Sequence, residues 1–198
     1  MRLEFGEMST ALKLMTVDEF LPWAEGQDGR WELHDGVPVL ISSAESVMMA
    51  PERAIHIRVK FSAAKALDRA VATASLPWEV FADGMAVRID ARTTFEPDAS
   101  VVCGPRRPAD AIEIDDPIVV VEVLSPTTAA IDHGRKLSGY FSLPSVEHYL
   151  ILDPERRVVI HHKRGSGDAI ETRVLSEGVV KLDPPGFEVA VEALFPLP

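Results

Sequence analysis

The chain contains 198 residues, of which 46% are hydrophobic and 26% are charged, as in an ordinary soluble globular protein. Its 31 acidic and 20 basic residues give a net charge of −11 at pH 7, which opposes non-specific adhesion to nucleic acid but leaves a local basic groove open. The one cysteine, Cys103, excludes an internal disulfide and a cysteine-rich zinc site, and it fits a reducing compartment.

The length and the hydrophobic pattern predict a soluble protein of one domain, residues 1–198. No apolar run approaches the roughly 20 residues that a membrane-spanning helix needs. The first residues, MRLEFGEMSTALKL, carry acids where a secretory signal has its apolar core. We therefore expect a cytoplasmic protein that does not contact a membrane.

The first elements in the chain are predicted from local signals. Residues 15–25 are expected to form a short helix, because Thr16 and Glu19 have the spacing of a capping box. The following segment, RWELHDGVPVL, has Asp35-Gly36 between two short extended runs, which predicts a hairpin with a two-residue turn.

The rest of the chain alternates less regularly between strands and helices. A helix is predicted from residue 51 to about 74, with a core face formed by Ile57, Phe61, Ala64, Leu67 and Val71. Further strands are expected at 76–82, 85–90, 98–103, 117–124, 147–152, 157–163 and 170–175, with a helix at about 128–142 and a surface loop at 103–117. This order predicts an α/β fold with a mixed central sheet and helices packed against it.

The strand predicted at 117–124, PIVVVEVL, carries Glu122 among valines, where a buried carboxylate is costly unless it is paired. Asp98, in the segment EPDASVV, starts another strand and is expected to be a neighbour of Glu122. Two adjacent carboxylates raise each other's proton affinity, and a divalent cation removes this conflict. Mg²⁺ favours one or two carboxylates together with water and phosphate oxygens. The two acids are thus candidate ligands of Mg²⁺ (or Mn²⁺), although Asp98 after a proline also fits a simple turn.

The helix that follows this strand offers a cation to the same site. Asp132, Lys136 and Tyr140 recur every four residues and share one face, and Thr127 or Thr128 is expected to cap the helix. Lys136 is expected to project towards the strand glutamate, where an ammonium group can orient a water and stabilise charge on a phosphate. An ordinary ion pair between residues 132 and 136 on a solvated helix is the alternative.

Together these segments resemble a known family. EPDASVV, VVVEVLSPTTAAIDHGRKLSGY and VEHYLILDP are similar, in the same order, to the Uma-type restriction endonucleases of the PD-(D/E)XK nuclease superfamily. RWELHDG and MMAPERAIH resemble the opening hairpin and the first long helix of that family, so the resemblance covers roughly residues 16–164. It implies a restriction-endonuclease-like core, with a metal site at one end of a mixed sheet.

Carried over by position, the resemblance implies that Asp98 and Glu122 are the metal-binding acids. The usual lysine of the superfamily would fall at Leu124, but in the Uma-type pattern it lies on the following helix, where Lys136 matches it. Glu32 matches an acidic position of the opening hairpin that faces the same site, although its alternation with Trp31 also fits a solvent-exposed side chain.

Other matches carry no assigned role. His56, Asp132 and Tyr140 match positions of the family, and His56 also fits an ordinary packed or surface histidine. The family commonly has Glu-Tyr-Trp in the strand after the lysine helix, where this chain has His148-Tyr149-Leu150, so no acid is expected to act at position 148.

The densest basic cluster comprises Arg156, Arg157 and residues 161–164, HHKR. These residues would contact phosphates if they lined a groove, but their positions on a predicted surface strand also fit a solvated face. The sequence contains no phosphate-binding loop and no nucleophile elbow.

The sequence thus predicts a metal-dependent endonuclease acting on DNA, with Asp98, Glu122 and Lys136 as catalytic residues and Glu32 assisting through water. One site cuts one strand, so a double-strand cut requires a homodimer or two visits. The alternative is a non-catalytic interaction or scaffold module that kept the nuclease fold. The net negative charge favours this alternative, whereas the intact set of two acids and a lysine argues against it.

Overall fold

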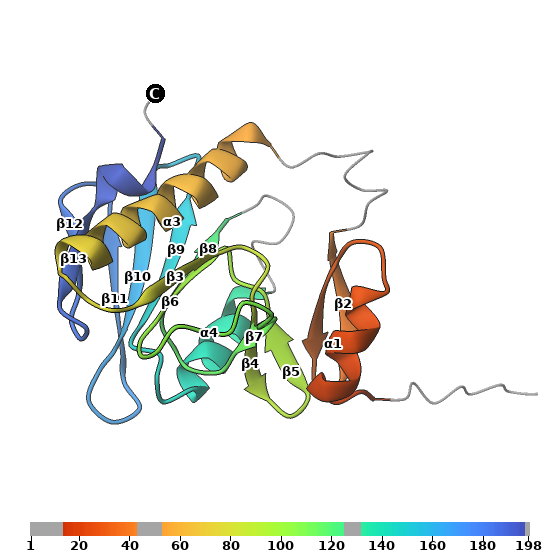
Figure 1. Cartoon of the computed structure of the whole chain (residues 1–198). Coiled ribbons are helices and arrows are strands. Elements are labelled where there is room, and N and C mark those ends of the chain that lie inside the picture. The colour runs from red at the N-terminus through yellow and green to blue at the C-terminus, as the bar shows by residue number, and fades with distance from the viewer. Residues whose placement is uncertain (1–13, 43–52, 125–131, 197–198) are drawn as a thin grey trace, which may run out of the picture.

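The computed structural model describes residues 14–42, 53–124 and 132–196 of the chain. The helices are α1 (Val17–Glu25), α3 (Ala54–Thr73), α4 (Asp132–Ser142) and the 3₁₀ helix η1 (Val191–Leu194). The strands, shown with the helices in Figure 1, are β1 (Arg30–His34), β2 (Val37–Ser42), β3 (Glu79–Ala82), β4 (Ala86–Asp90), β5 (Thr93–Phe95), β6 (Ala99–Val102), β7 (Glu113–Ile114), β8 (Pro117–Val123), β9 (His148–Asp153), β10 (Val158–Arg164), β11 (Ile170–Leu175), β12 (Val179–Leu182) and β13 (Phe187–Ala190). None of the helices in these residues is long and apolar enough to cross a membrane.

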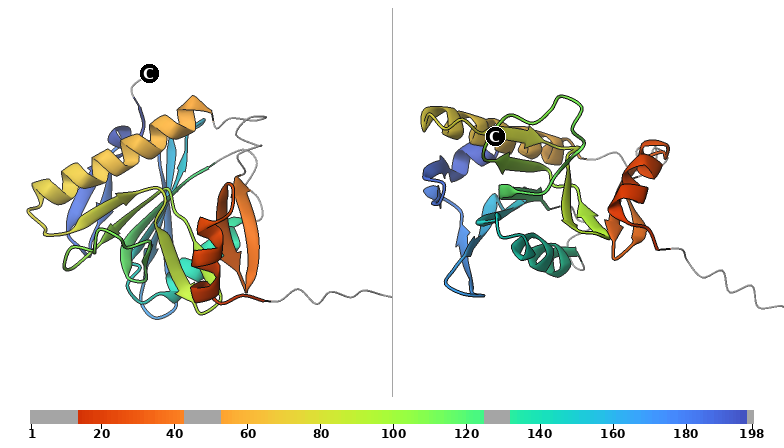
Figure 2. Two further views of the ribbon diagram at one scale, coloured as in Figure 1. Left: turned by 45° about the vertical axis from the view of Figure 1, so that its right-hand side comes forward. Right: turned by 60° about the horizontal axis from the view of Figure 1, so that its bottom comes forward.

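The larger sheet has the order β11-β10-β9-β8-β6-β3 and is mixed, because β8 and β9 are parallel whereas the other neighbours are antiparallel. α3 packs on one face of this sheet and α4 on the other (Figure 2). Along β8, Val119 and Val121 join the core under α3, whereas Val120 joins the core under α4. Glu122 continues this alternation and belongs to the α4 face. The α/β fold with a mixed sheet, predicted from sequence, is confirmed.

A second sheet, with the order β2-β1-β5-β4-β7, lies beside α4. α1 covers part of it, and a small core is formed there by Val17, Phe20 and Leu33. α4 connects the two sheets through Tyr140, whose ring packs against Phe95 of β5 and Tyr149 of β9 at centroid distances of 5.4 and 5.1 Å. Residues of β1, β8 and α4 can therefore reach one common space.

The close approach of α4 to β5 depends on Gly139. A Cβ atom at this position would lie 2.6 Å from Cε2 of Phe95, a ring that is almost fully buried. We expect Gly139→Ala to lower the free energy of unfolding by about 1–3 kcal/mol, as overpacking does. Urea unfolding followed by circular dichroism measures this change.

Gly134 on the same helix provides the matched control, because a Cβ atom there would meet nothing within 4 Å. Gly134→Ala is expected to be neutral or to stabilise the protein by up to about 1 kcal/mol, since alanine favours a helix. Equal stability changes in the two variants would contradict the close packing of Gly139.

Local signals in the first part of the chain are confirmed. The Glu19 N–H donates to Thr16 Oγ1 at 3.3 Å and the Thr16 N–H donates to Glu19 Oε2 at 3.0 Å, which is the predicted capping box. Asp35 and Gly36 join β1 to β2, and their positive φ angles of 51° and 85° fit the predicted two-residue turn.

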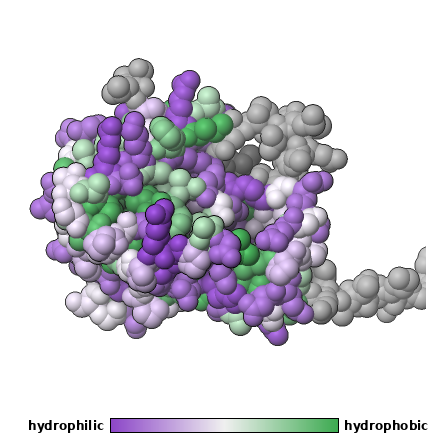
Figure 3. Space-filling model, viewed as in Figure 1, coloured by the Kyte–Doolittle hydropathy of each residue, from purple (hydrophilic) through white to green (hydrophobic). Residues whose placement is uncertain are grey.

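The predicted core face of the long helix is wrong in part, because Ile57 and Phe61 are 53% and 67% exposed. The buried residues of α3 are His56, Val59, Ala63, Ala64, Ala66, Leu67 and Val71. Small alanines let the helix lie close to the sheet, and their weak hydrophobic signal hides the true face in the sequence. On the side of the molecule that carries α3, hydrophobic residues are interspersed with hydrophilic ones (Figure 3).

Some elements were not predicted from sequence. In the polar loop at 103–117, β7 pairs with β4 in parallel, so part of this segment belongs to the second sheet. Near the end of the chain, β12 and β13 form a two-stranded ribbon. Its buried residues Val180, Leu182 and Val189 join the core under α3.

Candidate active site

The two acids proposed as metal ligands lie on neighbouring strands. Asp98 directly precedes β6, and its neighbour Ala99 pairs with Val121 of β8. The Asp98 N–H donates to the Val121 carbonyl at 3.0 Å, and Asp98 Oδ2 accepts the Val123 N–H at 2.6 Å. These bonds fix the Asp98 carboxylate against the stretch of β8 that carries Glu122, as the sequence predicted.

Lys136 of α4 joins Glu122 to Glu32. Its ammonium nitrogen lies 2.9 Å from Glu32 Oε1 and 3.0 Å from Glu122 Oε1, and the lysine side chain is only 7% exposed. One turn later, the Tyr140 hydroxyl donates to the same Glu122 Oε1 at 2.9 Å. Burial and the Glu122 carboxylate raise the pKa of Tyr140 well above its usual value, so this hydroxyl remains a donor. The shared helix face predicted for residues 136 and 140 is thus the face that meets the acids.

Glu32 is held by several partners besides the lysine. Its Oε1 accepts the Glu96 N–H at 2.9 Å, and its Oε2 lies 2.8 Å from His34 Nε2. Burial alone would raise the pKa of Glu32, but the His34 hydrogen bond and the charge of Lys136 outweigh it and hold the pKa below its usual value. The side chain is 1% exposed, so of the two alternatives left by the sequence it faces the site and not solvent.

The buried negative charge of Glu122 is balanced less completely than that of Glu32. Burial, followed by the nearby charges of Asp98 and Glu32, raises the pKa of Glu122 to about 7, although Lys136 opposes this shift. Both hydrogen bonds to its carboxylate reach Oε1, from Lys136 and Tyr140. In the described part of the chain, no donor bonds to Oε2. Among the described residues, Glu122 therefore has one carboxylate oxygen without a donor, and its negative charge is incompletely balanced.

Lys60 is a residue of the site that the sequence analysis missed. From α3 it places its ammonium nitrogen 2.9 Å from Asp98 Oδ1 and 3.8 Å from Asp83 Oδ2, with 15% of its side chain exposed. The available signal was a lysine one turn after His56 and on the buried stripe of α3. That signal was hidden because the core face of the helix was assigned one position away.

His56 and Asp132 match positions of the family, whereas His148 stands where the family commonly has glutamate. His56 is buried at 4% exposure, and within the described residues its Nε2 has no hydrogen-bond partner. Asp132 is the first residue of α4, but its side chain is outside the described part, as are Thr127 and Thr128. His148 is buried and bonds to the Pro184 carbonyl and to another histidine, away from the acids.

Two arginines of the basic cluster are bound within the protein. Arg164 donates to three backbone carbonyls, those of Phe141, Leu143 and Val146. Arg156 pairs with Asp153. These two arginines serve the fold, whereas His161 and Lys163 of the same cluster line a pocket beside the β12–β13 ribbon.

A divalent cation such as Mg²⁺ needs several oxygen ligands around it. In residues 14–42, 53–124 and 132–196, no group of three or more His, Cys, Asp or Glu side chains is arranged to hold a metal ion. Asp98 and Glu122 form a two-carboxylate set, and Mg²⁺ completes such a set with water and phosphate oxygens. The free Oε2 and the raised pKa of Glu122 fit this use, because a cation would supply the missing positive charge.

A mixed sheet with acids on adjacent strands and a lysine on the following helix is the arrangement that the sequence resemblance implied. The Uma2 family, described as “Putative restriction endonuclease”, matches residues 17–196, and the chain belongs to this family. The resemblance seen in the sequence is confirmed.

Similar proteins include two from Synechocystis sp., both described only as uncharacterized. One, slr1290, is 33% identical over 100 residues, which are 50% of this chain and 53% of that protein. The other, sll1609, is 24% identical over 169 residues, which are 83% of this chain and 90% of that protein.

Among solved structures, the fold resembles the crystal structure of “a putative nuclease belonging to DUF820” from Anabaena variabilis. The TM-score is 0.68 and the sequence identity 16%, over 91% of this chain and 97% of that one. At this identity, the likeness establishes the fold.

Proposed function

We propose that the protein is a metal-dependent endonuclease that hydrolyses phosphodiester bonds of DNA in the cytoplasm. The observation that carries the proposal is the meeting of Asp98, Glu122 and Lys136 at one place, from the residue before β6, from β8 and from α4. Membership of the Uma2 family supports DNA as the substrate.

In this proposal, Asp98 and Glu122 hold one Mg²⁺ or Mn²⁺, which when bound lowers the pKa of a water and offsets charge on the phosphate. Lys136 positions the attacking water or a phosphate oxygen, since its ammonium group is fixed between two carboxylates. Tyr140 fixes the orientation of Glu122 through its hydroxyl. Glu32 anchors Lys136 by direct contact, a role closer than the water-mediated one expected from sequence.

The rival proposal is a non-catalytic interaction module. The observation in its favour is that both lysines of the site already pair with carboxylates, which neutralises part of the charge that a metal would otherwise balance. Metal binding separates the two proposals, because a relic site has no reason to bind a cation specifically.

Thermal melting with and without Mn²⁺ measures such binding. At a Mn²⁺ concentration of about 100 times the dissociation constant, the native state should gain about 2.7 kcal/mol. Glu122→Gln is expected to abolish this gain because it removes one proposed ligand. Glu177→Gln, at an exposed acid outside the site, is the control and should keep the full gain. An equal gain in both variants would mean that the metal binds elsewhere.

A nuclease with one such site cuts one strand per visit. A double-strand break therefore requires a homodimer or two successive cuts, and C₂ dimers are the commonest oligomers.

A further inference from the structure

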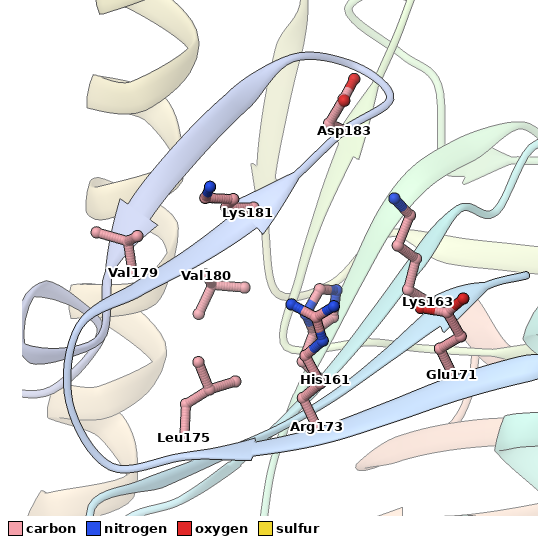
Figure 4. A pocket seen from close by; sticks show the side chains of 9 residues that line it. All are labelled: His161, Lys163, Glu171, Arg173, Leu175, Val179, Val180, Lys181 and Asp183. Atoms are coloured by element: carbon pink, nitrogen blue, oxygen red, sulfur yellow. The ribbon is translucent and has the colours of Figure 1, made fainter.

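A pocket lined by both charged and apolar side chains lies on the far side of the larger sheet from the acids. It has a volume of about 270 Å³ and is enclosed between the β10–β11 hairpin and the β12–β13 ribbon (Figure 4). Across the strands, Glu122 of β8 lies opposite Ile151 of β9, and Ile151 lies opposite Ile160 of β10. The side chains of these three residues therefore point to the α4 face of the sheet. His161 follows Ile160 in β10 and so points to the opposite face, into the pocket. The pocket is therefore distinct from the carboxylate site.

Strand register brings charged side chains together in this pocket. In the β10–β11 pair, His161 lies opposite Arg173 and Lys163 lies opposite Glu171. Since side chains alternate along a strand, these four share one face. β12 adds Lys181 from the other side of the pocket (Figure 4).

The cations of the pocket have no ion-pair partner among the described residues, although Lys163 lies opposite Glu171 in the strand register. In the described part of the chain, Lys163, Arg173 and Lys181 form no ion pair, whereas Arg88 of β4 binds both Glu113 and Asp18. A chain with a net charge of −11 offers many carboxylates. Three unpaired cations around one cavity therefore point to an anion from outside.

Two carboxylates also line the pocket, Glu171 and Asp183. Both carboxylates belong to exposed residues, as do Arg173 and Lys181, so water screens the carboxylates and these two cations alike. The cations exceed them by one charge, which leaves the lining positive in an acidic protein.

The floor of the pocket carries a hydrogen-bond acceptor. His148 Nε2 lies 2.7 Å from the Pro184 carbonyl and must donate to it, so His148 Nδ1 accepts from His161 Nε2 at 2.9 Å. Burial lowers the pKa of both histidines to about 4, and both rings are neutral at pH 7. His161 Nδ1 is then left as an unprotonated acceptor, and no donor in the described residues bonds to it.

We propose that this pocket binds a phosphate monoester or inorganic phosphate, with its anionic oxygens on Lys163, Arg173 and Lys181 and its O–H on His161 Nδ1. Phosphate monoesters suit the lining because they combine negative oxygens with a hydroxyl group near their second pKa of about 6. Sulfate has the same shape but carries no proton at this pH, so it cannot donate to the histidine.

Calorimetric titration at pH 6 and constant ionic strength tests the proposal with inorganic phosphate as the probe. We expect saturable binding that is stronger than that of sulfate. Arg173→Gln and Lys181→Gln should each weaken phosphate binding by about tenfold, the loss of one charge-assisted hydrogen bond. Arg58→Gln removes an exposed cation of α3 that lies outside the pocket, and it should leave the affinity unchanged.

The source of the phosphate is distinguished by oligonucleotides. Displacement of bound phosphate by a 5′-phosphorylated strand, but not by a 5′-hydroxyl strand, identifies a strand end as ligand. Failure of both strands identifies a small free molecule. Absence of saturable phosphate binding, or unchanged affinity in both Arg173→Gln and Lys181→Gln, would overturn the proposal. Neither result depends on nuclease activity, so this proposal can fail while the proposed function stands.

Discussion

Replacing Lys136 with methionine is expected to lower the free energy of unfolding by about 3–5 kcal/mol, the range found when one member of a buried ion pair is removed. The physical reason is that Glu32 and Glu122 would remain buried without the ammonium group that lies 2.9 and 3.0 Å from them. Chemical unfolding at pH 7 measures the loss. The loss should shrink as the pH falls, because protonation of the stranded carboxylates removes the buried charge.

A second substitution tests whether the unpaired carboxylate of Glu32 causes this loss of stability. Glu32→Gln keeps an oxygen to accept the Glu96 N–H and offers an amide to His34, so the double variant Lys136→Met with Glu32→Gln should recover most of the lost stability. Arg135 lies on the same helix as Lys136 and forms an exposed ion pair with Asp35 of the β1–β2 turn. Arg135→Met is therefore the control, and it should lower the free energy of unfolding by less than about 1 kcal/mol. No recovery in the double variant would show that lost packing, and not charge, explains the effect.

Replacing Lys60 with methionine is expected to strengthen Mn²⁺ binding by about tenfold, or about 1.4 kcal/mol. The ammonium group lies 2.9 Å from Asp98 Oδ1 and competes with a cation for that oxygen. Two unit charges 4 Å apart near a protein surface repel by about 4 kcal/mol. The expected gain in Mn²⁺ binding is therefore only part of this repulsion. The same variant should be less stable without metal, since Asp98 loses its counter-charge.

Isothermal titration of Mn²⁺ into the wild type and Lys60→Met measures this change. Lys65→Met, an exposed lysine of the same helix, controls for the loss of one positive charge. Weaker Mn²⁺ binding in Lys60→Met would show that Lys60 supports the site and does not compete with the metal.

The part of the site carried by β6, β8 and α4 was predictable from sequence. A glutamate among the valines of β8 signals a functional side chain, and the four-residue spacing of Lys136 and Tyr140 places both on one helix face. These signals are local or involve adjacent strands. The direct contact of Glu32 with Lys136 was not predictable in the same way, because it depends on how β1 packs beside α4 across the chain.

Lys60 and the ends of the fold show why sequence patterns fail elsewhere. On α3 the exposed Ile57 and Phe61 have a stronger hydrophobic signal than the buried alanines, so the pattern selects the wrong face. Lys60 lies beside the true buried face of α3, so it was not among the residues predicted for the site. The β12–β13 ribbon does alternate between buried and exposed residues, but each strand has only 4 residues, which is too short a run to give a clear signal in the sequence.

Cleavage of supercoiled plasmid is the measurement that tests the nuclease proposal most directly. Purified protein with Mg²⁺ or Mn²⁺ should nick the plasmid, whereas Asp98→Ala and Glu122→Ala should lose this activity and Lys65→Ala should keep it. Chelation of the metal should stop the reaction in the wild type. Nicking that survives in both acid variants, or that continues without metal, would contradict the assignment of Asp98 and Glu122 as a catalytic metal site.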